Sequence, residues 1–296
     1  MSYYESKFSA SKVNYGRKKK KLSILFIVAT IIVILGAATM LFPYVWMLLT
    51  SFKSVDEAWD PNLKLFPAEW LIEWYTKILV DPNFYSSVGY TLLLEVSVIG
   101  VGTLVSSLAA FAFAKLRLKG KRTFLLILMS SMMIPYAAVM LPQYRVFNDI
   151  GLTETIWPLI LPGLFGNVSM MFFLITYMKD GIPDALIESC KIDGCGYGKM
   201  YFTMALPLAK PAIAAQAIFW FVGIWNDFFG PSIYLTDPKV MTLQVYLNRL
   251  LSSTGSGVEL PTIMAGAVLA SLPMIIIFLC FQNFFIKSIA LSGMKE

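Results

Sequence analysis

Long apolar stretches alternate with short polar ones along the chain, and six of these stretches are long enough to cross a lipid bilayer. A helix needs about 20 mostly apolar residues to span the hydrocarbon core. The predicted spans run from Leu22 to Thr50, Val88 to Ala114, Phe124 to Leu141, Ile156 to Met178, Ala212 to Leu235 and Thr262 to Ile286. The pattern therefore predicts an all-α integral membrane protein with six transmembrane helices.

Composition agrees with a membrane protein. Hydrophobic residues make up 57% of the 296-residue chain and charged residues only 14%, whereas soluble domains carry about 25% charged residues. The mean hydropathy is +0.69. The first apolar stretch is much longer than the roughly 7–15 residues of a signal-peptide core, so we interpret it as a retained membrane helix.

The distribution of basic residues predicts the orientation. If the N-terminus is cytoplasmic, 18 of the 24 Lys and Arg residues fall on the cytoplasmic side, as the positive-inside rule requires. The run Arg17–Lys21 is then a topology signal that meets anionic lipid, and no nucleic-acid partner is expected. The predicted divisions are a basic cytoplasmic tail, the first membrane helix, an extracellular loop, a core membrane domain of five helices and a cytoplasmic tail: 1–21, 22–50, 51–87, 88–286 and 287–296.

Two acidic residues, Glu95 and Asp227, fall within predicted spans. A charge near the bilayer centre costs about 2.5–3.5 kcal/mol, so such residues are candidates for function. Asp227 follows Trp225 and Asn226, and an aromatic plane beside amide and carboxylate groups suits sugar hydroxyls. These four residues are the candidate substrate pathway. Two alternatives stay open: Glu95 reaches water or a polar neighbour near the outer end of its helix, and Asp227 belongs to a satisfied packing pair.

Small residues and prolines mark the packing of the predicted helices. Gly102, Ser106, Ala110 and Ala114 form a stripe at every fourth position, which lets another backbone approach closely. Prolines within or at the ends of spans predict kinks, some of which are candidate hinges: Pro43, Pro135, Pro158, Pro162, Pro231 and Pro273.

The polar loop between the fourth and fifth spans, residues 183–211, has its own helical signals. Pro183 and Asp184 suit the first turn of a helix, and Gly194 suits the left-handed position that ends one. The short helix between them is expected to expose Glu188, Lys191 and Asp193 to the cytoplasm, as a docking surface for a soluble partner. A second helix is expected to run from Tyr197 toward Leu206, after which Pro207 and Pro211 redirect the chain into the fifth span.

The same loop contains a misleading glycine pattern. Residues 194–199 resemble a phosphate-binding loop, but that motif needs a glycine where Asp193 stands and Ser or Thr where Met200 stands. We therefore expect this chain to bind no nucleotide or other cofactor. The chain has no histidine and three cysteines, so no metal site is expected either. Cys190 and Cys195 are interpreted as small packing residues in a reducing compartment, where disulfides are uncommon.

The loop resembles the "EAA" signature of ABC importer permeases. That signature reads here as Glu188-Ser189-Cys190, Asp193-Gly194, Met204 and Leu206-Pro207. The resemblance implies the type I ABC importer permease fold, with a cytoplasmic coupling helix that docks into an ATPase subunit. It also implies that a separate ATPase dimer hydrolyses the ATP, so that the permease is a transport subunit without an ATPase site.

Further segments are similar to the second, maltose-type permease of oligosaccharide importers. They are Pro43–Lys53, Ala110–Gly120, Trp225–Phe228 and the end of the chain from Gln282 to Lys287. Ser288 and Ser292 depart from the family, because glycines are common at those places. The resemblance implies a carbohydrate cargo, an oligosaccharide or a glycoside. It also implies three partners: a homologous second permease, the ATPase dimer and an extracellular or periplasmic solute-binding protein.

Three other functions are weighed against this prediction. The first alternative is the same permease role with a different cargo, such as a glycerol phosphate, which neighbouring genes would reveal. The second alternative is an ion-coupled secondary transporter that uses Glu95 and Asp227; such transporters show internal repeats, and we find none. The third alternative is a membrane enzyme, for which the usual general base, histidine, is absent.

Overall fold

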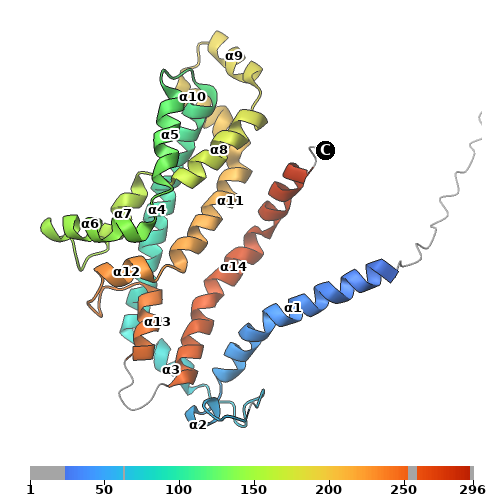
Figure 1. Ribbon diagram of the computed structural model, residues 1–296, viewed down its shortest axis with the longest axis vertical. Helices are drawn as coiled ribbons and strands as arrows, with labels where there is room; N and C mark the ends of the chain where they lie inside the picture. Colours follow the sequence, from blue (N-terminus) through green and yellow to red (C-terminus); the bar gives the residue numbers. More distant parts are fainter. Residues whose placement is uncertain (1–23, 63, 253–258, 294–296) are drawn as a thin grey trace, which may run out of the picture. The chain divides into compact units, whose positions relative to one another are not determined.

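A computed structural model describes residues 24–62, 64–252 and 259–293, with side chains described as far as Gln282. Every regular element in these ranges is helical (Figure 1). The chain forms two units, Met1–Trp46 and Met47–Glu296, which are described separately. The helices are α1 (Ile24–Thr50), α2 (Val55–Ala58), α3 (Glu73–Leu79), α4 (Pro82–Lys115), α5 (Lys121–Ser131), α6 (Tyr136–Asp149), α7 (Trp157–Leu164), α8 (Val168–Gly181), α9 (Asp184–Ile192), α10 (Tyr197–Met200), α11 (Leu206–Trp225), α12 (Phe229–Tyr234), α13 (Leu243–Ser252) and α14 (Leu260–Gly293).

The first unit holds most of α1, the helix that matches the first predicted span. It contains Pro43 within the helix. The stretch from Phe26 to Thr50 is long and apolar enough to cross a membrane. The basic tail predicted at residues 1–21 lies outside the described residues.

The second unit contains four more helical segments that are long and apolar enough to span a bilayer: Pro82–Lys115, Trp157–Gly181, Tyr197–Trp225 and Leu260–Gln282. The predicted third span is not one straight helix, because α5 and α6 meet at a bend of 90°. Pro135 stands at that bend in an extended conformation, and a proline also disfavours the helical conformation of the residue before it, here Ile134. Counting this broken pair as one span gives the six that the sequence predicts.

Several boundaries differ from the predictions. The second span begins at Pro82, six residues earlier than expected, because the side chain of Asp81 caps it by accepting a hydrogen bond from the backbone N–H of Asn83 at 2.9 Å. The last helix, α14, continues to Gly293, through the first residues of the predicted cytoplasmic tail.

The fifth span differs most. A single helical segment runs from Tyr197 to Trp225, so Pro207 and Pro211 lie inside it and do not redirect the chain. A π-helical stretch, Tyr201–Ala205, precedes Pro207. The wider turn accommodates a proline, which has no N–H to donate. The helix ends at Trp225, and the non-helical residues Asn226–Phe228 separate it from α12.

The small-residue stripe on α4 confirms the close packing that the sequence predicts. A Cβ atom on Gly102 would lie 2.4 Å from the Trp220 ring and 2.5 Å from the carbonyl oxygen of Gly163. Ser106 Oγ accepts a hydrogen bond from the backbone N–H of Asn167 at 2.7 Å. The break between α7 and α8 is thereby fixed against α4.

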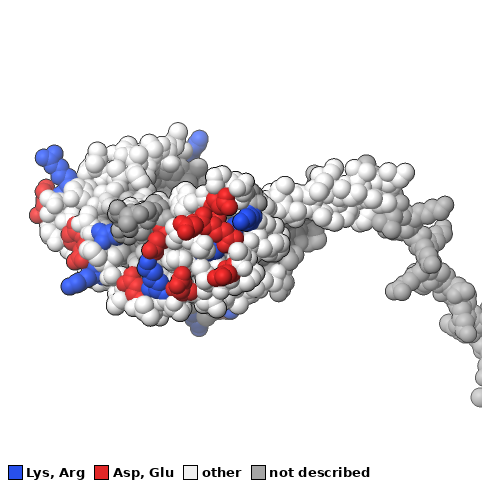
Figure 2. Space-filling view, turned by 90° about the horizontal axis from the view of Figure 1, so that it is seen from below, with Lys and Arg blue, Asp and Glu red and all other residues white. Residues whose placement is uncertain are grey.

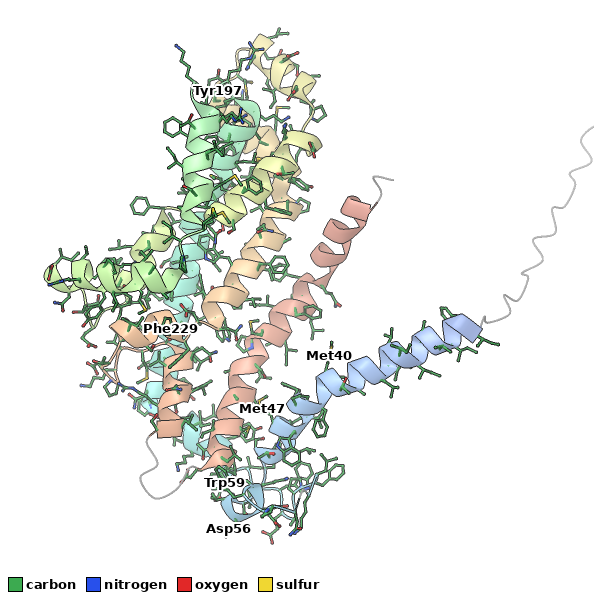
Figure 3. All side chains as sticks on the ribbon, in the orientation of Figure 1. Met40, Met47, Asp56, Trp59, Tyr197 and Phe229 are labelled. Carbon is green, nitrogen blue, oxygen red and sulfur yellow. The ribbon has the colours of Figure 1, made fainter. Side chains whose placement is uncertain are left out.

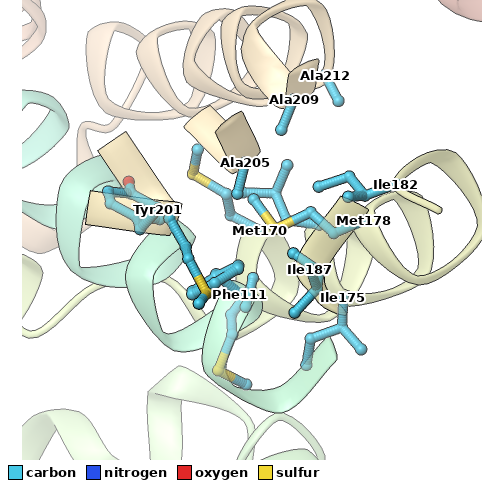
Figure 4. Close-up of a cluster of buried hydrophobic side chains, with 14 residues drawn as sticks. Phe111, Met170, Ile175, Met178, Ile182, Ile187, Tyr201, Ala205, Ala209 and Ala212 are labelled. Carbon is cyan, nitrogen blue, oxygen red and sulfur yellow. The ribbon is translucent and has the colours of Figure 1, made fainter. Parts of the chain in front are cut away.

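One apolar cluster fills the end of the second unit that carries α9 (Figure 4). It joins side chains from α4, α8, α9 and the Tyr197–Trp225 segment: Phe111, Met170, Leu174, Ile175, Met178, Ile182, Ile187, Met200, Tyr201, Ala205, Ala209 and Ala212 among them. We call this end of the second unit the α9 end. The opposite end, with α2, α3 and α13, is the α3 end. In Figure 3, Tyr197 marks the first, and Asp56 and Trp59 mark the second.

Candidate functional site

The α9 helix begins and ends at the residues that the sequence predicts. Pro183 precedes it in an extended conformation and Asp184 lies in its first turn. Gly194 takes the left-handed conformation, with φ of 73°. Two backbone hydrogen bonds close the end of the helix: Gly194 N–H donates to Lys191 O at 3.0 Å, and Cys195 N–H donates to Cys190 O at 2.9 Å. This pair of bonds is the Schellman motif.

The faces of α9 differ in character. Ile187 is 3% exposed and inserts into the apolar cluster, and Cys190 is half-buried against it. Glu188, Lys191 and Asp193 are exposed, as predicted. The exposed Ser189 hydroxyl donates to Leu186 O at 3.0 Å. The helix is therefore anchored by one apolar side chain and presents charged groups outward.

A buried lysine ties α9 to two other helices. The side chain of Lys115, the last residue of α4, is only 2% exposed. Its Nζ donates to Asp184 Oδ1 at 2.7 Å and to Lys179 O at 3.1 Å. The hydrogen bond and the positive charge of Lys115 lower the pKa of the Asp184 carboxyl. The sequence places Lys115 directly after a predicted apolar span, and that position is the available sequence signal for its role.

The remaining residues of the predicted signature lie on the next helical segment. Leu206 is half-buried against the apolar cluster, and Pro207 is exposed beside it. The thiol of Cys190 contacts the thioether sulfur of Met204. This contact brings α9 together with the π-helical stretch that leads into α11.

The structure separates the residues of the candidate substrate pathway. Trp225 is 2% exposed, stacks on Phe221 and donates its indole N–H to Ala270 O at 3.0 Å. Asn226 and Asp227 are exposed at the end of the helix, not deep within a span as predicted. Asn226 Nδ2 donates to Val222 O at 2.8 Å, and Asp227 Oδ1 accepts from the backbone N–H of Gly230 at 3.1 Å. Trp225 therefore does not share a surface with its two polar neighbours.

Glu95 lies in the interior of the second unit. Because α4 begins at Pro82, the carboxyl is more than three turns inside the helix and only 2% exposed. Among the described residues, neither of its carboxyl oxygens has a hydrogen-bond partner. The interpretation that it reaches water or a polar neighbour near the helix end is therefore wrong for this chain on its own.

The α3 end carries a group of carboxylates. Figure 2 shows Asp and Glu side chains gathered over this face. The segment before α4 contributes Asp56, Glu57, Asp60, Glu69, Glu73 and Asp81 against three lysines. One of these, Lys53, is buried and donates to Lys64 O at 2.5 Å. Trp59 and Trp70 are exposed among the carboxylates, so this face combines negative charge with aromatic surface.

Comparisons with known proteins agree with this architecture. A relative from Halalkalibacterium halodurans, the arabinooligosaccharides transport system permease protein AraQ, is 28% identical over 94% of this chain and 99% of its own. Protein LplC of Bacillus subtilis is 30% identical over 88% of this chain and 90% of its own. A chain in the crystal structure of a bacterial ABC transporter involved in the import of alginate superposes with a TM-score of 0.79 at 22% identity, over 90% of this chain and 98% of that one. That likeness shows the fold.

The family model that matches residues 102–290 is described as the binding-protein-dependent transport system inner membrane component. The match begins at Gly102 in the packed stripe of α4 and includes the whole of α9. It covers well over half of the chain, and LplC matches at 30% identity over most of it. The chain is therefore a multi-pass membrane protein that belongs to the family of inner membrane components of binding-protein-dependent transport systems.

Proposed function

We propose that this chain is the permease subunit that moves an oligosaccharide or a glycoside through an ATP-driven importer, with α9 as its coupling helix. The observation that supports this proposal most directly is how α9 is held and which of its residues are exposed. Ile187 and Lys115 hold the helix at one end of the bundle, while Glu188, Lys191 and Asp193 remain exposed. Such a helix is suited to follow a partner subunit that moves, since it is fixed to three other elements and its charged face is free for contact.

The proposal places the α9 end in the cytoplasm. Lys115, Lys179, Lys191 and Lys199 all lie at or near this end, in keeping with the positive-inside rule. Both termini are then cytoplasmic and the α3 end faces outward.

Each end of the second unit has its own proposed partner. The α9 end docks an ATPase dimer, which supplies and hydrolyses the ATP. The α3 end receives a solute-binding protein; a second similar structure, with a TM-score of 0.61, is that of a bacterial alginate ABC transporter in complex with an alginate pentasaccharide-bound periplasmic protein. A homologous second permease completes the pathway. Neighbouring lipid covers the remaining apolar helix faces.

The carbohydrate cargo is supported by the named relatives. Among them are an arabinooligosaccharides permease and a diacetylchitobiose uptake permease of Streptomyces coelicolor, each matching most of this chain. Asn226 and Asp227 are the residues that we propose to contact cargo, because they are exposed and polar at the end of a span.

Transport requires that closure of the ATPase favours one orientation of the pathway over the other. Typical coupling free energies are about 1–3 kcal/mol. In the proposed mechanism, closure of the ATPase moves α9, and the helices fixed to it turn the pathway outward.

Charge reversal on α9 tests the proposal. We expect Glu188→Lys, in the assembled transporter in vesicles, to lower ATP-driven oligosaccharide uptake about tenfold or more while the ATPase remains bound. The matched control is Asp149→Lys, an exposed reversal at the end of α6, which should leave uptake unchanged.

Unchanged uptake by Glu188→Lys with the ATPase in place would refute the docking role. Uptake that survives ATP depletion and follows an ion gradient would instead support a secondary transporter.

A further inference from the structure

Two cysteines meet at the C-terminal end of α9. The Schellman motif that closes this helix joins Cys195 N–H to Cys190 O. In this motif the side chains at those two positions commonly touch as an apolar pair. Here both positions are cysteine, so the backbone bonds that end the helix also bring two thiols together.

The contacts of the thiols agree with this placement. Both cysteines are half-buried and free, both pack against the same apolar cluster, and Cys195 is close enough to help raise the pKa of the Cys190 thiol. A disulfide needs Cα atoms about 4.4–6.8 Å apart and Cβ atoms that face each other. The backbone hydrogen bond between Cys195 and Cys190 keeps the two residues adjacent, so the disulfide needs only a turn of the Cys190 side chain from Met204 toward Cys195.

We propose that Cys190 and Cys195 form a reversible disulfide under peroxide stress and that this bond uncouples the permease from its ATPase. The second half of this proposal rests on the proposed function of α9. Cytosolic disulfides are rare, and those that occur are usually transient and redox-sensing.

The chemistry balances with hydrogen peroxide as the oxidant. The Cys195 thiolate attacks one peroxide oxygen, giving a sulfenic acid and releasing the other oxygen as water after protonation. The Cys190 thiolate then attacks that sulfur, the S–S bond forms, and the hydroxyl leaves as a second water. Two thiols and one peroxide thus give one disulfide and two waters. A cellular dithiol restores both thiols by exchange.

The environment of the pair assigns the order of these steps. Burial, with Cys195 and Asp193 close by, raises the pKa of the Cys190 thiol. Since the thiolate is the nucleophile, Cys190 is poorly suited to the first attack, and we assign that step to Cys195.

The disulfide would act on the contact between α9 and α11. In the reduced chain, the Cys190 sulfur contacts Met204 in the π-helical stretch before α11. The disulfide turns the Cys190 side chain toward Cys195 and closes a covalent ring of residues 190–195, which contains Gly194. Both the end of α9 and its contact with the next span are then altered.

The test uses the assembled transporter in vesicles, with Cys280→Ser to remove the third thiol. After hydrogen peroxide, we expect the peptide that contains both cysteines to lose the mass of two hydrogens. ATP-driven uptake should fall at least about fivefold, the lower range of coupling effects, and dithiothreitol should restore both. The added Cys195→Ser variant should keep its uptake under the same treatment.

Three results would overturn the proposal: two thiols that remain separately alkylatable after peroxide, a disulfide that leaves uptake unchanged, or equal inhibition of Cys195→Ser. A failure of the proposed function is recognised separately, because the untreated transporter would then show no ATP-driven uptake. The mass measurement does not depend on that result.

Discussion

Each end of the second unit contains an apolar cluster, and the two ends differ in the polar contacts that are added to it. At the α9 end, an apolar cluster holds Ile187, and Lys115 adds one ion pair. At the α3 end, directional hydrogen bonds join separate segments. Trp74 Nε1 donates to Lys53 O at 2.8 Å, Ser51 Oγ and Tyr75 Oη share a bond of 2.7 Å, and the hydroxyl of Tyr246 donates to Asp81 Oδ2 at 2.9 Å.

This difference suits the two ends to different mechanical roles. Apolar contacts are not directional, so a helix that they anchor can shift as a body with little loss. Hydrogen bonds weaken steeply when their angles change, so the segments at the α3 end keep one shape. The α9 end therefore suits a coupling element, and the α3 end suits a preformed surface for a soluble partner.

The largest expected effect comes from removing the apolar anchor of α9. Ile187→Ala deletes a side chain that is 3% exposed, and such core truncations cost about 2–5 kcal/mol. We expect uptake to be lost while the chain remains in the membrane. Uptake assays, together with protease cleavage at the 183–196 loop, measure this.

Leu186→Ala is the matched control for the anchor, since the Leu186 side chain is next to Ile187 in the chain but is 38% exposed. An equal loss in both variants would mean that α9 is not held by Ile187.

The next effect concerns the turn that ends α9. Gly194→Ala places a Cβ at φ of 73°, where side chains cost about 1–2 kcal/mol. We expect reduced uptake and faster proteolysis of the loop. Gly196→Ala is the control, because Gly196 has φ of −69° and open space around it. Identical behaviour of the two variants would contradict a role for the left-handed turn.

A smaller effect is expected from one hydrogen bond at the α3 end. Tyr246→Phe removes the bond to Asp81, and a typical net contribution is about 0.5–1.5 kcal/mol. Thermal unfolding of the purified subunit should shift downward, whereas coupling measured after reassembly should not change. Tyr85→Phe, which removes an exposed bond to Leu79 O, should shift unfolding less; the reverse order would count against this account of the α3 end.

The smallest effect is a pH dependence at the α9 end. Lys115 lowers the pKa of Asp184 in the folded chain, so the ion pair stabilises the start of α9 above the ordinary carboxyl pKa of about 3.9. That contribution is lost as the pH falls through the lowered pKa. The labelling rate of a cysteine introduced by Ala185→Cys, divided by that of a free thiol at the same pH to correct for the smaller thiolate fraction, should therefore rise only in acid.

Adding Asp184→Asn to the labelled chain should abolish this acid response. An acid response that persists in the double variant would show that another group controls the start of α9.

The sequence predicted features that depend on local chemistry. The start of α9 at Pro183 and its end at Gly194 follow from the backbone preferences of single residues, and the stripe on α4 follows from side-chain size. The break after Trp225 was missed because the apolar residues continue to Leu235, and hydropathy does not report a helix end. The buried position of Lys115 was missed because its two acceptors come from helices far along the chain.

The unbroken segment from Tyr197 to Trp225 has a mechanical consequence. Its 29 residues form a rod about 43 Å long at 1.5 Å per residue. One end is in contact with α9 through Met204 and Cys190, and the other leads directly into Asn226 and Asp227. A rotation of only about 5° about the α9 end moves the far end of such a rod by about 4 Å. That distance is comparable to the width of a hydroxyl group with its hydrogen bond, so a small motion at one face becomes a change of contacts at the other.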